Sequence, residues 1–192
     1  MQKLIFIIAV FLVTRTSAAP TNPAAPTNPT TPAAPTPPTP PTNPAAPVFT
    51  RADLVASGLT CSLCSNAIYK ALVALPFVTK VTPDVENSSF RIIFRPGTTP
   101  DIDALSRAVI GAGFSVARMT LTLDVDQIKV HNDAEVVLGG LTFHFLRVTP
   151  ETLNGETTVR VVDKDFLPAK EFRRYAIQTG FREGTRIYHV TI

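Results

Sequence analysis

A long proline-rich tract limits where this chain can build a folded core. From Pro20 to Pro47 the sequence uses only proline, alanine, threonine and asparagine, and the phrase Thr-Asn-Pro-Ala-Ala-Pro occurs at 21–26 and again at 42–47. Such a segment has no charge and little apolar bulk, so it cannot bury enough surface to offset the entropy of ordering. We expect residues 19–49 to form a disordered linker that favours extended polyproline II structure.

The residues before this tract have the pattern of a secretory signal peptide. Lys3 is followed by an apolar run at 4–13 and then by small residues at 17–19. The run is too short to span a bilayer as a helix, and no cysteine follows it that could carry a lipid. We expect cleavage after Ala18, which removes residues 1–18 and leaves an exported periplasmic or extracellular protein with no stable membrane insertion. An uncleaved anchor is the alternative.

The charge of the chain gives no support for a nucleic-acid partner. The full sequence has a formal net charge of +3, but Lys3 and Arg15 lie in the expected signal peptide. Removing these two from the 18 basic residues leaves 16, against 15 acidic residues. A nearly neutral mature chain lacks the field that attracts polyanions, so we expect no nucleic-acid or anionic-membrane partner.

After the tract, the spacing of apolar residues predicts six elements in the order strand, helix, strand, strand, helix, strand. That order is typical of a ferredoxin-like βαββαβ domain, in which four antiparallel strands carry two helices on one face. Pro83 lacks a backbone donor, so its strand should lie at a sheet edge. The expected elements are 52–60, 64–75, 77–85, 90–95, 100–111 and 114–123.

The second of these helices has recognisable start and stop signals. We expect Thr99 to be its N-cap and Pro100 to take its first helical position, with Asp101 complementing the helix dipole. Gly111 and Gly113 should end it. The residues expected to face the core are Ile102, Leu105 and Val109.

The remaining residues predict a small, mostly-β α+β unit at 125–192, which gives an α+β protein with two folded units, 50–124 and 125–192. Asn154-Gly155 is expected to be a hairpin turn. A short helix is expected between Pro168 and Gln178, and strands at 135–138, 141–148, 157–162 and 186–192. The role of this unit stays open, and it is expected to pack on the first unit because ~65 residues have little stability alone.

Cys61 and Cys64 are the only cysteines in the chain, and they stand between the first expected strand and the first helix. Two thiolates with this spacing can converge on one ion, and the positive end of the helix favours the thiolate form. Two sulfurs are too few for a closed tetrahedral zinc site. They suffice for a soft two-coordinate ion, for which we expect Cu(I) first and Hg(II) second.

The run Gly58-Leu59-Thr60-Cys61-Ser62-Leu63-Cys64 resembles the G-M-T-C-x-x-C metal loop of heavy-metal-associated domains, the family of copper and mercury carriers. The resemblance covers about residues 50–124. It implies that Gly58, Leu59, Thr60, Ser62 and Phe114 support the metal loop, with the ring of Phe114 beside it and Leu59 packing beneath it where the family usually has Met. It also implies transfer of the metal between this chain and a donor or acceptor protein.

Two other interpretations of the cysteine pair stay open. An exported CxxC meets an oxidising compartment, so Cys61 and Cys64 can form a structural disulfide in a metal-free interaction module. A thiol–disulfide redox protein is the other alternative, although no aromatic residue precedes Cys61 and no parallel βαβ pattern surrounds the motif.

No other residues form a recognisable catalytic or metal-binding motif, so we expect a protein that is not an enzyme. His131, His144 and His189 have no ligand spacing to one another, and ordinary positions in a sheet are the simpler interpretation. A set of basic residues near the end of the sequence is expected to be a solvated face. Its members are Lys170, Arg173, Arg174, Arg182 and Arg186. The oligomeric state is left open.

Overall fold

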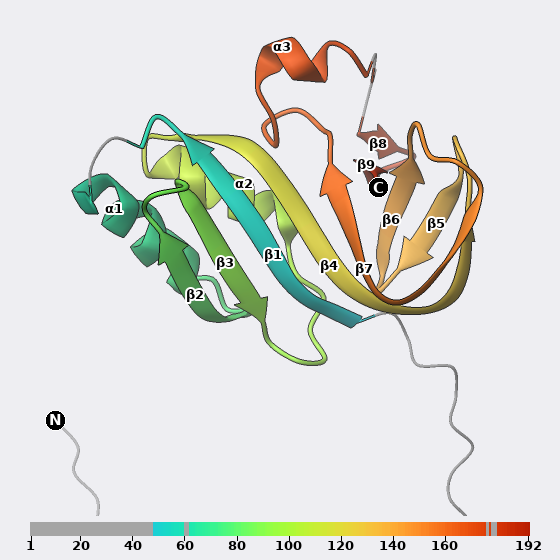
Figure 1. Ribbon diagram of the computed structural model, residues 1–192, viewed down its shortest axis with the longest axis horizontal. Coiled ribbons are helices and arrows are strands. Elements are labelled where there is room, and N and C mark those ends of the chain that lie inside the picture. Colours follow the sequence, from blue (N-terminus) through green and yellow to red (C-terminus); the bar gives the residue numbers. More distant parts are fainter. Residues whose placement is uncertain (1–47, 60–61, 176, 178–179) are drawn as a thin grey trace, which may run out of the picture. The chain divides into compact units, whose positions relative to one another are not determined.

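The first half of the folded chain has the expected split βαβ order. The computed structural model describes residues 48–59, 62–175, 177 and 180–192 (Figure 1). Antiparallel pairing gives the strand order β2-β3-β1-β4, and both helices lie on one face of these strands. The ferredoxin-like fold is confirmed for this segment. Its elements are β1 (Val48–Ser57), α1 (Ser62–Val73), β2 (Val78–Asp84), β3 (Ser89–Phe94), α2 (Ile102–Gly111) and β4 (Ser115–Val130).

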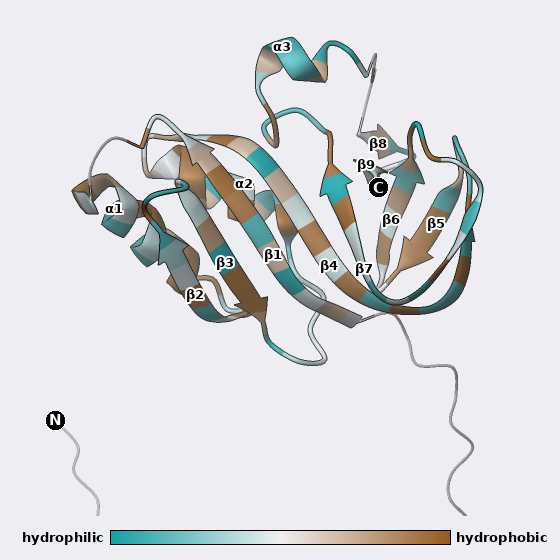
Figure 2. Ribbon diagram, in the orientation of Figure 1, coloured by the Kyte–Doolittle hydropathy of each residue, from teal (hydrophilic) through white to brown (hydrophobic). Residues whose placement is uncertain are grey.

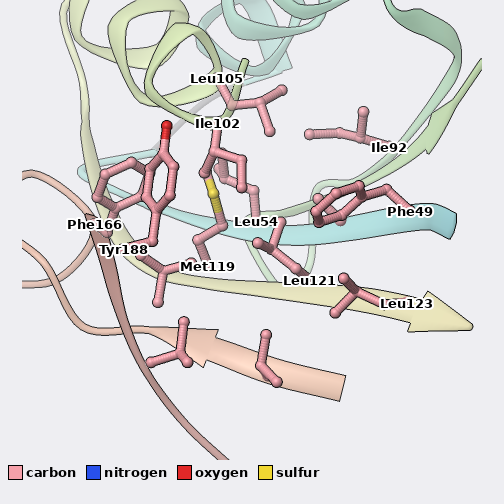
Figure 3. Packing of buried hydrophobic residues seen from close by; sticks show 14 of the residues in the cluster. Phe49, Leu54, Ile92, Ile102, Leu105, Met119, Leu121, Leu123, Phe166 and Tyr188 are labelled. Atoms are coloured by element: carbon pink, nitrogen blue, oxygen red, sulfur yellow. The ribbon is translucent and has the colours of Figure 1, made fainter. Parts of the chain in front are cut away.

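Apolar side chains fill the space between these helices and the sheet. The inward residues of α2 are those expected from the sequence, and Ile102, Leu105 and Val109 are all fully buried. In β3 the buried residues alternate with partly or fully exposed ones, a pattern that appears as bands of hydropathy along the strands in Figure 2. Figure 3 shows Ile102 and Leu105 of α2 packed over Leu54 of β1 and Leu121 of β4.

Pro83 lies in β2, the strand that ends the sheet path on this side. A proline cannot donate to a sheet ladder, so an edge position satisfies it. The tight turn between β2 and β3 is held by Asp84, whose carboxylate accepts hydrogen bonds from the side chain and the backbone of Asn87 at 2.7 and 3.1 Å. These bonds lower the pKa of Asp84. The edge position of Pro83 was expected.

The expected start of α2 was wrong by two residues. Its N-cap is Asp101, whose carboxylate accepts a hydrogen bond of 2.9 Å from the backbone N–H of Ala104. The Thr99 hydroxyl instead donates to the carbonyl of Gly139 at 2.8 Å, and Pro100 is buried before the helix begins. Threonine and aspartate are both good caps, and a contact with a distant loop decides between them.

The residues after 124 extend the same sheet. Strand β7 pairs with β4 along most of its length, and the strand order continues as β4-β7-β9-β6-β5, with β8 beside β9. The boundary expected at residue 124 therefore falls inside β4. These elements are β5 (Glu135–Leu138), β6 (Leu141–Phe145), β7 (Glu151–Val161), α3 (Ala169–Phe172), β8 (Phe181–Arg182) and β9 (Thr185–Thr191).

The hairpin turn expected at Asn154-Gly155 was wrong, because both residues lie within β7. The pairing of β4 with β7 shifts register between Val125 and Ile128, so two residues of β4 stand opposite Asn154 alone. Gly155 has a φ of 70° and pairs with Val125 at the edge of this bulge. A glycine at a bulge and a glycine in a turn meet the same backbone requirement.

The other expected elements of this part differ in length. The expected helix between Pro168 and Gln178 is shortened to α3, which ends at Phe172. Strand β6 ends at Phe145 rather than Val148, and β7 begins at Glu151, well before the expected position.

A partly buried ionic network joins α2 to β9. The Arg186 guanidinium donates to both carboxylate oxygens of Asp103 at 2.9 and 3.1 Å and lies 3.0 Å from Oδ2 of Asp163. Burial lowers the pKa of Arg186, but the hydrogen bond to Asp103 and the two negative charges outweigh it and raise the pKa. Burial and the charge of Asp103 raise the pKa of Tyr188, whose hydroxyl donates to Asp103. In Figure 3, Tyr188 and Phe166 reach the same core as Met119.

We predict that Arg186→Met lowers the free energy of unfolding by about 3 kcal/mol, because Asp103 and the buried Asp163 lose their shared cation. The matched control is Arg182→Met, which removes an exposed partner of Glu135 and should change stability little. Urea unfolding followed by circular dichroism measures both. Equal effects of the two substitutions would contradict the network's role.

We also predict that Asp101→Ala lowers the free energy of unfolding by about 1 kcal/mol, because it removes the cap of α2. The control is Asp126→Ala, which removes an exposed carboxylate outside any helix. The same urea experiment compares them. If the control costs as much as Asp101→Ala, the loss reflects charge rather than capping.

Candidate metal loop

The expected metal loop joins β1 to α1. It begins after Ser57 and ends where α1 starts at Ser62. Thr60 and Cys61, which were expected to support and to bind the metal, lie outside the described residues. The structure therefore places one of the two expected ligands, Cys64.

Cys64 lies in the first turn of α1 rather than on the loop before it, because the helix begins two residues earlier than expected. Its side chain is partly buried, whereas the neighbouring Ser62 and Leu63 are exposed. The first turn of α1 contains no acidic residue. No carboxylate within this turn therefore lies next to Cys64 along the helix.

Gly58 leaves β1 with a φ of 84°, which L side chains rarely adopt. The Phe114 ring lies on its open side, since a Cβ built on Gly58 would stand 4.0 Å from Cδ1 of Phe114. Phe114 in turn follows Gly113, another residue with positive φ, at the end of α2. Leu59 is half-buried and packs on the hydrophobic core. At the start of the loop, Gly58 thus lies beside the Phe114 ring, and Leu59 packs on the core.

Hydrogen bonds on both sides of β1 fix the end of this strand, where the loop begins. Ser57 pairs with Ser115 of β4, and the Ser57 hydroxyl donates to the Ser115 carbonyl at 3.3 Å. On the other side the N–H of Ala56 donates to the carbonyl of Ser88 at 2.9 Å. The turn between β2 and β3 therefore lies beside the same end of the sheet, where it exposes Val85.

The structure places two of the three histidines side by side and the third apart from them. His131 is exposed, and its Nδ1 lies 2.8 Å from the carbonyl of Asn132. His144 and His189 face each other across β6 and β9, with ring centroids 5.1 Å apart. Alternation along each strand could identify exposed or buried positions, but the parallel pairing that brings these two rings together has no sequence signal.

The expectation of one solvated basic face needs a correction. Arg186 is held among carboxylates in the network described above, and Arg182 pairs with Glu135 at 2.7 Å. Arg182 is nevertheless exposed, as are Lys170, Arg173 and Arg174.

The family comparison agrees with this geometry. The heavy-metal-associated domain matches residues 54–115, which run from the middle of β1 to the first residue of β4. This segment is a heavy-metal-associated domain, and it covers about a third of the chain. No curated protein matches the sequence.

Several solved structures are similar to about a third of the chain. The yeast copper transporter domain Ccc2a is 27% identical and covers 35% of this chain and 90% of its own, with a TM-score of 0.31. Oxidized MerP from Ralstonia metallidurans CH34 is 27% identical over 35% of this chain and 96% of its own, with a TM-score of 0.32. The CopZ metallochaperone is 20% identical over 35% of this chain and its whole length, with a TM-score of 0.33.

Among the described residues, no helix has the length and apolar character needed to cross a membrane.

We predict that Gly58→Ala destabilises the metal-free protein by about 1 kcal/mol, because a Cβ strains the positive-φ conformation. The matched control is Gly111→Ala at the end of α2, where φ is not positive and a Cβ meets nothing within 4 Å. That substitution should leave stability unchanged or raise it slightly. Thermal unfolding measures both, and a Gly58→Ala variant as stable as the control would show that the loop relaxes freely.

Proposed function

We propose that this protein binds one soft metal ion through Cys61 and Cys64 outside the cytoplasm and passes it to a partner protein. The observation that carries the proposal is the position of the CxxC motif. It lies within the segment that matches the heavy-metal-associated domain, and Cys64 lies in the first turn of α1. Cu(I) is the expected ion, and Hg(II) is the alternative cargo.

The choice of a soft ion follows from ligand chemistry. Thiolates prefer Cu(I), Hg(II) and related ions, and two of them satisfy linear coordination. The whole sequence contains only two cysteines, so a single copy of the chain cannot provide a four-sulfur zinc site. A two-coordinate ion also stays open to attack by a thiolate of another protein, which is the chemistry that transfer requires.

The surroundings of the motif support exchange of the ion. Leu63, between the two cysteines, has 79% of its side chain exposed, and Val85 in the neighbouring turn is 54% exposed. Exposed apolar side chains near a metal loop offer contact area to a docking partner. The export and cleavage of residues 1–18 remain proposals that rest on the signal-peptide pattern.

A structural disulfide between Cys61 and Cys64 is the second candidate, and it is favoured by the oxidising compartment that export implies. A redox enzyme has less support. The strands that flank the motif are antiparallel to their neighbours, whereas thioredoxin-like proteins place a CxxC beside a βαβ unit.

We predict that the reduced protein binds one Cu(I) or one Hg(II) and binds Zn(II) far more weakly, and that the Cys61→Ser, Cys64→Ser variant binds neither soft ion. Native mass spectrometry of each mixture measures the number of ions bound. Leu63→Ser is the matched control, because it changes the motif without removing a thiol, and it should keep the ion. Equal binding by the double variant, or no binding of either soft ion by the reduced wild type, would reject the metal-carrier proposal.

A further inference from the structure

Two imidazoles outside the metal loop lie side by side in the sheet. His144 of β6 and His189 of β9 are direct partners in a parallel pair of strands (Figure 1). Their ring centroids are 5.1 Å apart, and the ring planes are inclined by 46°. The rings are accessible to different extents, since the side chain of His144 is 20% exposed and that of His189 is 9% exposed.

A buried carboxylate orients His189. Oδ1 of Asp163 lies 2.7 Å from Nδ1 of His189, and Oδ2 of the same group accepts from the backbone N–H of His189 at 3.2 Å. Asp163 is 3% exposed and is also paired with the Arg186 guanidinium. An ionised carboxylate only accepts hydrogen bonds, so the neutral form of His189 that fits this contact has its proton on Nδ1 and its lone pair on Nε2. Proteins orient metal-binding histidines in this way.

His144 has acidic groups on its other side. Its Nε2 lies 3.5 Å from Oδ1 of Asp133, and Glu135 of β5 is its cross-strand partner. Asp133 is placed there by its backbone N–H, which donates to the carbonyl of Phe145 at 2.8 Å. The side chain of Asp133 is 71% exposed. Its Oδ2 accepts a hydrogen bond of 2.7 Å from the side-chain amide of Asn132, so Oδ1 is the oxygen that faces His144, while Glu135 is already paired with Arg182.

The separation of the two rings suits a shared ion. With metal–nitrogen distances of about 2 Å and a tetrahedral angle between the bonds, the two ring centroids should be about 5 Å apart. The observed 5.1 Å meets this spacing without movement of either strand. Because Asp163 holds the ring of His189, the remaining adjustment is rotation of the His144 ring, whose Nε2 lies near Asp133.

We propose that His144 and His189 form a second metal site, which binds a divalent ion of borderline softness, such as Zn(II), through the two Nε2 atoms. Imidazole suits such ions, whereas the CxxC motif selects soft ones. Among the described residues, no three histidine, cysteine or acidic side chains are already gathered as ligands. The site is therefore a two-histidine site that solvent or the carboxylate of Asp133 completes, and it binds its ion reversibly rather than as a structural centre.

The test uses the full chain with Cys61→Ser and Cys64→Ser, so that thiolates do not contribute and the result is independent of the proposed carrier function. Isothermal titration with Zn(II) should show one site, and Co(II) should give visible absorption bands of the intensity typical of a low-symmetry site. Adding His144→Gln should weaken Zn(II) binding at least about tenfold. The matched control is His131→Gln, which removes an exposed imidazole and should leave the affinity unchanged.

Nitrogen-detected NMR of the imidazoles gives a readout that a purely structural role would not move. Zn(II) should shift Nε2 of both His144 and His189 while Nδ1 of His189 stays protonated. Asp163→Asn should weaken binding without abolishing it, because it disturbs the orientation of one ligand. The proposal is overturned if the cysteine-free chain binds no Zn(II) or Co(II), or if His144→Gln binds either ion as tightly as its parent.

Discussion

The pairing of β4 on both of its sides is the constraint on which the rest of the fold depends. Strand β4 is antiparallel to β1 on one side and to β7 on the other. Three consecutive residues, Leu121, Thr122 and Leu123, are buried within it. In an isolated domain of four strands β4 would be an edge, with a row of unpaired backbone groups. Here the C-terminal strands cover that edge, so the heavy-metal-associated segment and the strands that follow it share one sheet and one core.

An ion pair also joins the heavy-metal-associated segment to the strands that follow it. Asp103 is on α2, within the heavy-metal-associated domain, and Arg186 is on β9, beyond it. Their contact orients α2, whose far end carries Gly113 and Phe114 beside the metal loop. The appended strands therefore stabilise the helix that supports the loop, although none of the expected metal ligands belongs to them.

Sequence patterns predicted those features of the fold that depend on residues close together in the chain. The buried faces of α2 and β3 and the edge position of Pro83 followed from periodicity and from the missing donor of proline. The Asp101 cap could not be predicted, because the Thr99 hydroxyl donates to the carbonyl of Gly139, which is distant in the sequence. The role of Gly155 could not be predicted either, because a bulge and a turn require the same backbone conformation of glycine. The CxxC motif identified the candidate site, whereas the neighbouring positions of His144 and His189 depend on strand pairing that no short sequence pattern encodes.

The position of β9 has a consequence for how the chain folds. This strand lies between β7 and β6, and its pairing with β6 joins residues that are more than forty positions apart in the sequence. Contacts between distant residues require large loops to close before they contribute, and such topologies fold slowly. Within the described part of the chain, β5 and β6 pair only with each other and with β9, so they join the rest of the sheet through β9. The pairing of β9 therefore decides when the sheet becomes continuous, and before that step the edges of β6 and β7 are exposed to other molecules.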